Sequence, residues 1–230
     1  MTEPTDLRDG DALVVVDVQP DFCPGGALPV PDGDAVIPVI NAWLEAAKGK
    51  DVTVVASRDW HPSQHPSFEA HGGPWPTHCV QDTPGAAFHA NLKLPTGAVV
   101  ISKGTRLDKD QYSAFDETGL GDWLKARGVK RVFACGLAED VCVRATAIDA
   151  AKAGFETHVI SAATRPVTPE GGEEAVVDLG PGEDGQAHRR PTAERPALRR
   201  GGRGGQGDLP GLGPAELHAR EGVTPRLTSP

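Results

Sequence analysis

The sequence has little of what a membrane or secreted protein needs. No apolar run in its 230 residues approaches the roughly 18 that cross a bilayer, which excludes a transmembrane protein. The N-terminal segment joins no basic stretch to a short apolar one, so we expect no secretory signal and a cytoplasmic location. The four cysteines are too few for a disulfide scaffold and form no C-x-x-C pair, so each needs a separate reason to be present.

Excess positive charge is also absent. The net charge is −9 at pH 7, whereas nucleic-acid grooves and surfaces that bind anionic membranes concentrate Lys and Arg. We therefore expect neither nucleic acid nor a membrane as a partner. The sequence alone leaves a homo-oligomer open.

Large apolar side chains become scarce after Leu179, and this divides the chain into two parts. Residues 1–179 alternate apolar runs with amphipathic stretches, whereas residues 180–230 are rich in Gly, Pro and Arg and contain no aromatic residue, Ile or Cys. Such a segment buries too little apolar surface to offset the entropy of ordering it, so we expect 180–230 to be a disordered tail. Its abrupt start also fits a shifted reading frame at the end of the gene.

The first part, 1–179, is predicted to be one α/β domain. Its apolar runs are short and rich in β-branched residues, as in strands that are buried on both faces, and amphipathic stretches separate them. This alternation indicates parallel strands joined by right-handed crossovers. The strands are expected at residues 13–16, 52–56, 98–102, 131–135 and 155–161, and the helices at 36–48, 122–127, 139–153 and 169–179.

Reactive side chains follow the ends of several of these strands. Asp17 ends the first, and Asp59 and His61 follow the end of the second. Lys103 ends the third, and Cys142 lies near the start of the helix after the fourth. Because ligands bind beyond the carboxyl ends of parallel strands, we expect these side chains to meet there.

Their chemistry suits nucleophilic catalysis. A helix N-terminus lowers the pKa of a thiol such as Cys142, a buried Asp17 could act as its base, and Lys103 would offset their shared negative charge. Taken singly, the cysteine could be a packing residue and the Asp–Lys pair an ordinary ion pair. Together at three strand ends, they favour a cysteine nucleophile.

A second candidate cluster consists of one carboxylate and two imidazoles. Asp59 and His61 leave the second strand two residues apart, and His78 lies in a later loop rich in Pro and Gly. This donor set suits Zn²⁺, Fe²⁺ or Mn²⁺ with positions left open for water or substrate. His65 is a possible fourth ligand and His71 a weaker candidate. The same residues could instead form a hydrogen-bonded loop.

Two aromatic residues, Phe22 and Trp75, are expected near the same edge of the sheet. They could belong to the core, or they could sandwich a flat ring between their faces. The remaining cysteines, Cys23, Cys79 and Cys135, are expected to be packing residues.

Five blocks of sequence carry a resemblance that covers about residues 12–174. They are VVDVQPDFC at 15–23, RDWHP at 58–62, PWPTHCV at 74–80, SKG at 102–104 and GLAEDVCV at 136–143. In this order they resemble the nicotinamidases (pyrazinamidases), which belong to the isochorismatase-like superfamily of cysteine hydrolases. The resemblance implies a three-layer αβα fold with a mainly parallel six-stranded sheet. It also implies hydrolysis of nicotinamide, the small-molecule substrate, to nicotinate and ammonia in NAD salvage, with pyrazinamide also accepted.

The resemblance assigns a role to each candidate residue. It implies a catalytic triad of Asp17, Lys103 and Cys142, and one divalent metal ion held by Asp59, His61 and His78. It further implies a cis peptide between Leu137 and Ala138, an oxyanion hole formed by the N–H groups of Ala138 and Cys142, and pyridine contacts from Phe22, Trp75 and Leu137.

The chain departs from the family where the sixth strand should follow, because the Gly/Pro/Arg-rich tail begins there. A missing edge strand would expose apolar surface and an unpaired ladder. Two alternatives therefore stay open: another amide hydrolase of the same superfamily, and a catalytically impaired relative that acts as a binding protein.

Overall fold

The structure is a computed structural model that describes residues 3–179. The tail expected at 180–230, and the disorder expected of it, lie outside the described residues. Within residues 3–179, no helix is both long enough and apolar enough to cross a bilayer.

Five parallel strands form one sheet in the order β3-β2-β1-β4-β5, as the α/β prediction requires. The apolar run of β1 lies at the centre, and all five of its residues are buried. The strands are β1 (Ala12–Val16), β2 (Thr53–Asp59), β3 (Val99–Lys103), β4 (Arg131–Leu137) and β5 (Glu156–Arg165). The sixth strand that the family resemblance implies would follow the last described helix, so it falls outside the described residues.

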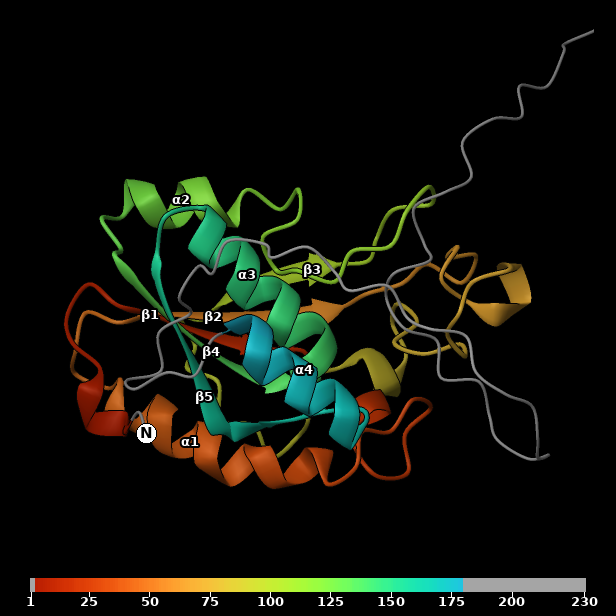
Figure 1. Ribbon diagram of the computed structural model, residues 1–230, viewed down its shortest axis with the longest axis horizontal. Coiled ribbons are helices and arrows are strands. Elements are labelled where there is room, and N and C mark those ends of the chain that lie inside the picture. Colours follow the sequence, from red (N-terminus) through yellow and green to blue (C-terminus); the bar gives the residue numbers. More distant parts are fainter. Residues whose placement is uncertain (1–2, 180–230) are drawn as a thin grey trace, which may run out of the picture. The chain divides into compact units, whose positions relative to one another are not determined.

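Helices cover both faces of the sheet, which gives the three layers visible in Figure 1. Along β1, Leu13 and Val15 pack into a core with α1, whereas Val14 and Val16 pack into a second core with α2 and α3. Successive side chains of a strand point to opposite faces of the sheet, and here both faces are covered by apolar layers. The helices are α1 (Val36–Ala46), α2 (Leu120–Ala126), α3 (Arg144–Lys152) and α4 (Pro169–Leu179).

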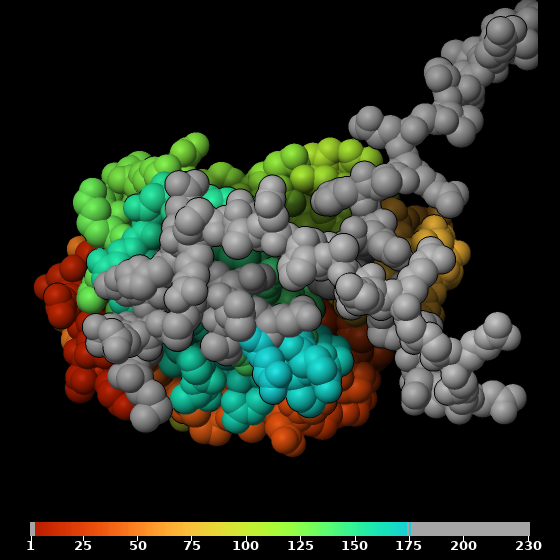
Figure 2. Space-filling model, in the orientation of Figure 1, coloured from red at the N-terminus to blue at the C-terminus, as the bar shows by residue number. Residues whose placement is uncertain are grey.

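The predicted helix at 139–153 begins differently from its expected form. Residues Glu139–Val143 form a π-helical turn, η6, and only then does α3 begin. π turns often occur at functional sites. Helix α4 packs against η6 and α3, and Figure 2 shows α4 at the surface.

The strand order places the site. β1 pairs with β2 on one side and with β4 on the other. Strands β2 and β3 therefore extend the sheet in one direction from β1, and β4 and β5 extend it in the opposite direction. In open parallel sheets, ligands bind at this switch point, beyond the carboxyl ends of the strands. Asp17 leaves β1 at this edge, and Asp59 and Lys103 end β2 and β3 as register partners.

Candidate active site

The Lys103 ammonium group lies at the centre of a buried polar cluster. Its Nζ is 2.7 Å from Asp17 Oδ2, 2.6 Å from Asp59 Oδ1 and 3.4 Å from Cys142 Sγ. Asp17 and Lys103 are fully buried, and Cys142 is 5% exposed. The structure thus brings together Asp17, Lys103 and Cys142, and it places the Asp59 carboxylate, which ends the neighbouring strand, against the same lysine.

Asp17 is held in place by its backbone and by a neighbouring strand. Its φ of 48° is left-handed, a conformation that Asp tolerates better than most residues, and its N–H donates to the carbonyl of Ser57. The Ser57 hydroxyl donates to Oδ1 at 2.7 Å. The other carboxylate oxygen, Oδ2, therefore faces Lys103.

Burial dominates the electrostatics of this cluster. It raises the pKa of Asp17 to about 6, although Lys103 acts in the opposite direction. Burial would also raise the pKa of Asp59, but the attraction of Lys103 and His61 holds that pKa well below its usual range. Lys103 stays charged, because the two carboxylates raise its pKa against the effect of burial.

The pKa of Cys142 differs from the sequence expectation. A helix N-terminus was expected to lower it, whereas in the structure burial raises it well above its usual value and Lys103 compensates only in part. The free energy lost when a thiolate is removed from water exceeds the stabilisation that the first turn of the helix gives it. The resting thiol is therefore protonated, and a base has to remove its proton. The reactive oxygens of Asp17 and Asp59 and the Cys142 sulfur lie within 4.8 Å of one another.

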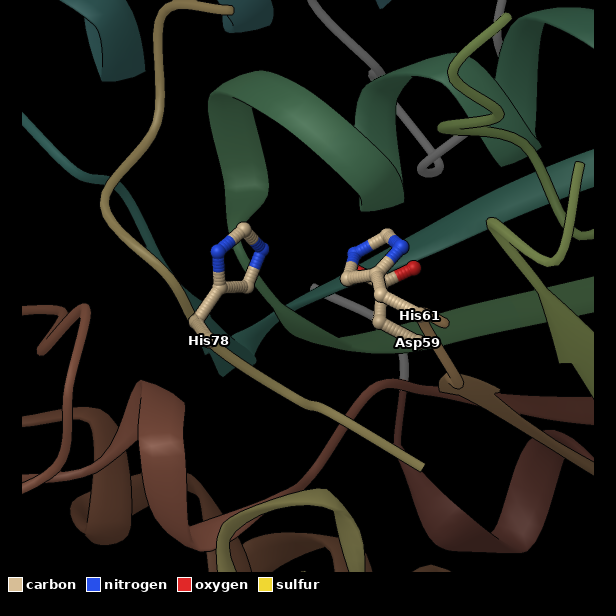
Figure 3. Close-up of side chains that lie close together, drawn as sticks. All are labelled: Asp59, His61 and His78. Carbon is tan, nitrogen blue, oxygen red and sulfur yellow. The ribbon is translucent and has the colours of Figure 1, made fainter. Parts of the chain in front are cut away.

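Asp59, His61 and His78 also converge, with their ligand atoms within 4.8 Å of one another (Figure 3). Asp59 and His61 come from the end of β2 and the residues after it, and His78 comes from the following loop. His61 Nδ1 lies 2.8 Å from the Gly104 carbonyl, and His78 Nδ1 lies 2.7 Å from the Pro76 carbonyl.

These carbonyl contacts fit a metal site. A carbonyl only accepts, so each Nδ1 carries the hydrogen and each Nε2 keeps its lone pair, the tautomer that a metal requires. Burial lowers the pKa of His78, which keeps this imidazole neutral. Burial alone would lower the pKa of His61, but the Asp59 carboxylate raises it, so a metal ion at this position would take the place of a proton held beside that carboxylate.

His65 lies beside this trio. It is fully buried, its ring centroid is 4.2 Å from that of His61, and its Nδ1 contacts the Ser67 hydroxyl at 2.7 Å. Its Nε2 has no hydrogen-bond partner among residues 3–179, and burial lowers its pKa to about 4. With His61 and Asp110 it forms a second group whose ligand atoms lie within 4.8 Å of one another. His71, the weaker candidate, is exposed.

Cys142 lies in the η6 turn directly after β4. The Leu137–Ala138 bond that precedes this turn is cis, as the resemblance implies. The first π-helical hydrogen bond of η6 is donated by the Val143 N–H to the carbonyl of Ala138, five residues earlier. The Cys142 N–H precedes this bond and therefore lies at the open end of the turn.

A mostly apolar pocket lies between these groups. Phe22 and Trp75 both line it, and the Phe22 ring lies 5.5 Å from that of His78. Leu137 does not line it: this side chain is fully buried in the core on the α1 side of the sheet. Several residues that no sequence pattern singled out also line the pocket, namely Leu28, Pro29, Val30, Asp110, Tyr112, Val141 and Val167.

The other cysteines, Cys23, Cys79 and Cys135, are buried and unoxidised, in agreement with the packing interpretation. None of the three lines the pocket.

Known proteins resemble this chain in sequence and in fold. The isochorismatase domain matches residues 11–181. A nicotinamidase of Acinetobacter baylyi is 42% identical over 182 residues, which cover 70% of this chain and 83% of that protein. The crystal structure of a pyrazinamidase of Pyrococcus horikoshii in complex with zinc is 52% identical with a TM-score of 0.71, covering 73% of this chain and 93% of that one. The structure of an L. infantum relative in complex with nicotinate is 40% identical with a TM-score of 0.69, covering 77% and 89%.

Proposed function

This chain belongs to the isochorismatase domain family, and on that premise we propose that it is a nicotinamidase, an amidohydrolase that converts nicotinamide to nicotinate and ammonia. The observation that carries the proposal is the contact of one buried ammonium, Lys103 Nζ, with Asp17, Asp59 and the Cys142 sulfur. It joins a nucleophile and its base to the carboxylate of a metal-binding trio.

The first chemical step is attack by Cys142 on the carboxamide carbon. Asp17 accepts the thiol proton, and its pKa of about 6 suits a base that works near neutral pH. The sulfur forms a bond to the carbon, and the carbonyl oxygen becomes an oxyanion. We assign its stabilisation to the N–H groups of Ala138 and Cys142, since donors fixed in place before reaction act strongly in a buried site.

Collapse of this intermediate releases ammonia. The C–N bond breaks, Asp17 returns its proton to the leaving nitrogen, and a thioester to Cys142 remains. A water molecule then gives a proton to Asp17 and attacks the thioester. The C–S bond breaks, and Asp17 returns the proton to the Cys142 sulfur. The acid product gives its own proton to solvent and leaves as nicotinate.

Asp59, His61 and His78 would hold one divalent ion, Zn²⁺, Fe²⁺ or Mn²⁺, because their ligand atoms converge, and the zinc complex of the Pyrococcus relative supports a divalent ion. When bound, such an ion supplies a Lewis acid to which the pyridine nitrogen can coordinate. The unpartnered Nε2 of His65 supports this side chain as a fourth ligand.

Phe22 and Trp75 are assigned to the two faces of the pyridine ring, since both line the pocket beside the metal trio. Pyrazinamide has the same ring size and carboxamide, so we propose that it is also a substrate. The cytoplasmic location expected from the sequence is part of this proposal. In that compartment the product would enter NAD salvage.

The test is ammonia release from nicotinamide by the purified full-length chain loaded with Zn²⁺, Fe²⁺ or Mn²⁺. Cys142→Ala should abolish release, while the matched variant Cys135→Ala, which removes a buried thiol outside the pocket, should retain it. Release by Cys142→Ala would refute the nucleophile. A folded, metal-loaded parent that releases ammonia from another linear amide but not from nicotinamide would refute the substrate. A parent that binds nicotinamide without any hydrolysis would favour a binding protein.

A further inference from the structure

The two sides of the pocket are joined by one hydrogen bond between pocket-lining side chains. Trp75 comes from the loop between β2 and β3, and Tyr112 comes from the loop between β3 and α2. The indole Nε1–H of Trp75 donates to the Tyr112 hydroxyl at 3.1 Å. Both rings are partly buried, so this bond is sheltered from bulk water.

The segment around Tyr112 is fixed on both sides. The carbonyl of Gln111 lies 3.5 Å from Lys103 Nζ, and the Gln111 side chain donates to the Asp116 carbonyl at 2.7 Å. Two residues beyond Tyr112, the Ala114 N–H donates to the hydroxyl of Thr146 in α3 at 3.0 Å. The tyrosine hydroxyl is therefore presented from a segment anchored both to the catalytic lysine and to the helix that follows the nucleophile.

The backbone of Trp75 is also fixed, but its indole is not. Its N–H donates to the Ser67 carbonyl at 3.0 Å, and its carbonyl accepts from the Glu69 N–H at 2.7 Å. These bonds leave the side-chain torsions free. Within the described part of the chain, the polar edge of the indole has one hydrogen-bond partner, Tyr112.

We propose that Tyr112 is a positioning residue that holds the indole of Trp75 at the angle needed to stack on the substrate ring. This inference rests on the proposed function, because the ring is that of nicotinamide. Asp110 is the charged group beside the hydroxyl, and burial together with this carboxylate raises the pKa of Tyr112. The hydroxyl therefore stays protonated and can accept from Trp75 while its own hydrogen is turned towards Asp110. If the indole is already oriented before the substrate binds, less conformational entropy is lost when the ring binds.

The kinetic test is a double-mutant cycle in the metal-loaded full-length chain. Tyr112→Phe removes only the hydroxyl, and the loss of a neutral hydrogen bond should raise KM for nicotinamide by about 2- to 10-fold. The kcat should fall by less than about twofold, since the reacting atoms keep their partners. In a Trp75→Phe background the indole N–H is already gone, so adding Tyr112→Phe should change KM by less than about twofold. Metal content should be equal in all four proteins.

Two results would overturn the proposal. An unchanged KM in Tyr112→Phe would show that the hydroxyl orients nothing that the substrate senses. An equal rise of KM in both backgrounds would show that the hydroxyl acts on the substrate directly, without Trp75.

A second measurement does not depend on turnover. In ¹⁵N-labelled protein, the indole signal that disappears in Trp75→Phe belongs to Trp75. In Tyr112→Phe this signal should shift and its N–H should exchange faster with water, while the other tryptophan indoles stay unchanged. An unaltered Trp75 signal would refute the hydrogen bond itself. If the chain failed to hydrolyse nicotinamide but the signal moved as expected, the proposed function would fall while the Trp75–Tyr112 contact stood.

Discussion

Replacement of Gln19 by Met tests whether a buried amide holds the carboxylate shared by the two clusters. Gln19 is fully buried, and its side chain pairs with the backbone of Asp59 in both directions. Oε1 accepts from the Asp59 N–H at 2.8 Å, and Nε2 donates to the carbonyls of Asp59 at 2.8 Å and Ala86 at 2.9 Å. Methionine has nearly the same length and volume but cannot make any of these bonds.

The magnitude follows from the groups left without a partner. Gln19→Met deprives one buried N–H and two carbonyls of a hydrogen bond, and each such group costs about 1–3 kcal/mol when it stays unsatisfied. No cavity opens, and the apolar side chain returns part of this cost. We therefore expect a loss of about 3–5 kcal/mol in the free energy of unfolding, or about 6–20 °C in Tm for a chain of this size.

The assay is urea unfolding of the metal-free proteins, because a bound ion would add its own stabilisation. Gln81→Met is the matched control, since Gln81 is partly exposed and its side chain has one hydrogen bond within residues 3–179, donated to the Trp60 carbonyl at 2.9 Å. It should lose about 0.5–1.5 kcal/mol. If both variants lost the same free energy of unfolding, the pairing with Asp59 would not be the source of stability that we infer.

Three further predictions concern the base, the metal and the tail. Because burial raises the pKa of Asp17 to about 6 and the base acts only when ionised, kcat/KM should fall roughly tenfold per pH unit below about pH 6; a profile flat to about pH 4.5 would refute Asp17 as the base. His78→Ala should lower bound metal, measured by elemental analysis, and raise KM by about 10- to 100-fold; full metal content would refute the ligand. Deletion of 180–230 should leave kcat/KM within about twofold, since the pocket lining found among residues 3–179 already holds the proposed nucleophile and metal trio; a larger loss would give the tail a role.

The sequence predicted the cluster of Asp17, Asp59 and Lys103 because each follows an apolar run and parallel strands share a carboxyl edge. Leu137, which ends β4, differs from these residues, because its side chain is buried in the core. Phe133, Cys135 and Leu137 alternate onto the face of the sheet that packs against α1, so the period of the strand carries Leu137 into that core. The same alternation of large apolar side chains is visible in the sequence over 133–137.

The missed residues are of a different kind. Asp110 and Tyr112 lie in a long loop after β3 that has no hydrophobic period, and their place in the pocket depends on how that loop folds back. The bond that fixes Tyr112 to Trp75 spans 37 residues of sequence. No local pattern encodes such a contact, so only the tertiary structure shows it. The raised pKa of Cys142 was missed for a similar reason, because burial is a property of the whole fold.

Asp59 links the candidate catalytic triad to the candidate metal-binding trio, so the two clusters form one site. Its Oδ1 contacts Lys103 at 2.6 Å, while its Oδ2 lies 3.7 Å from His61 Nε2. One carboxylate therefore faces the lysine of the triad with one oxygen and the metal trio with the other. Two buried carboxylates, Asp17 and Asp59, oppose the single positive charge of Lys103. A cation beside His61 would offset the second carboxylate, so the same charge balance that favours metal binding also leaves Lys103 free to stabilise negative charge at Cys142.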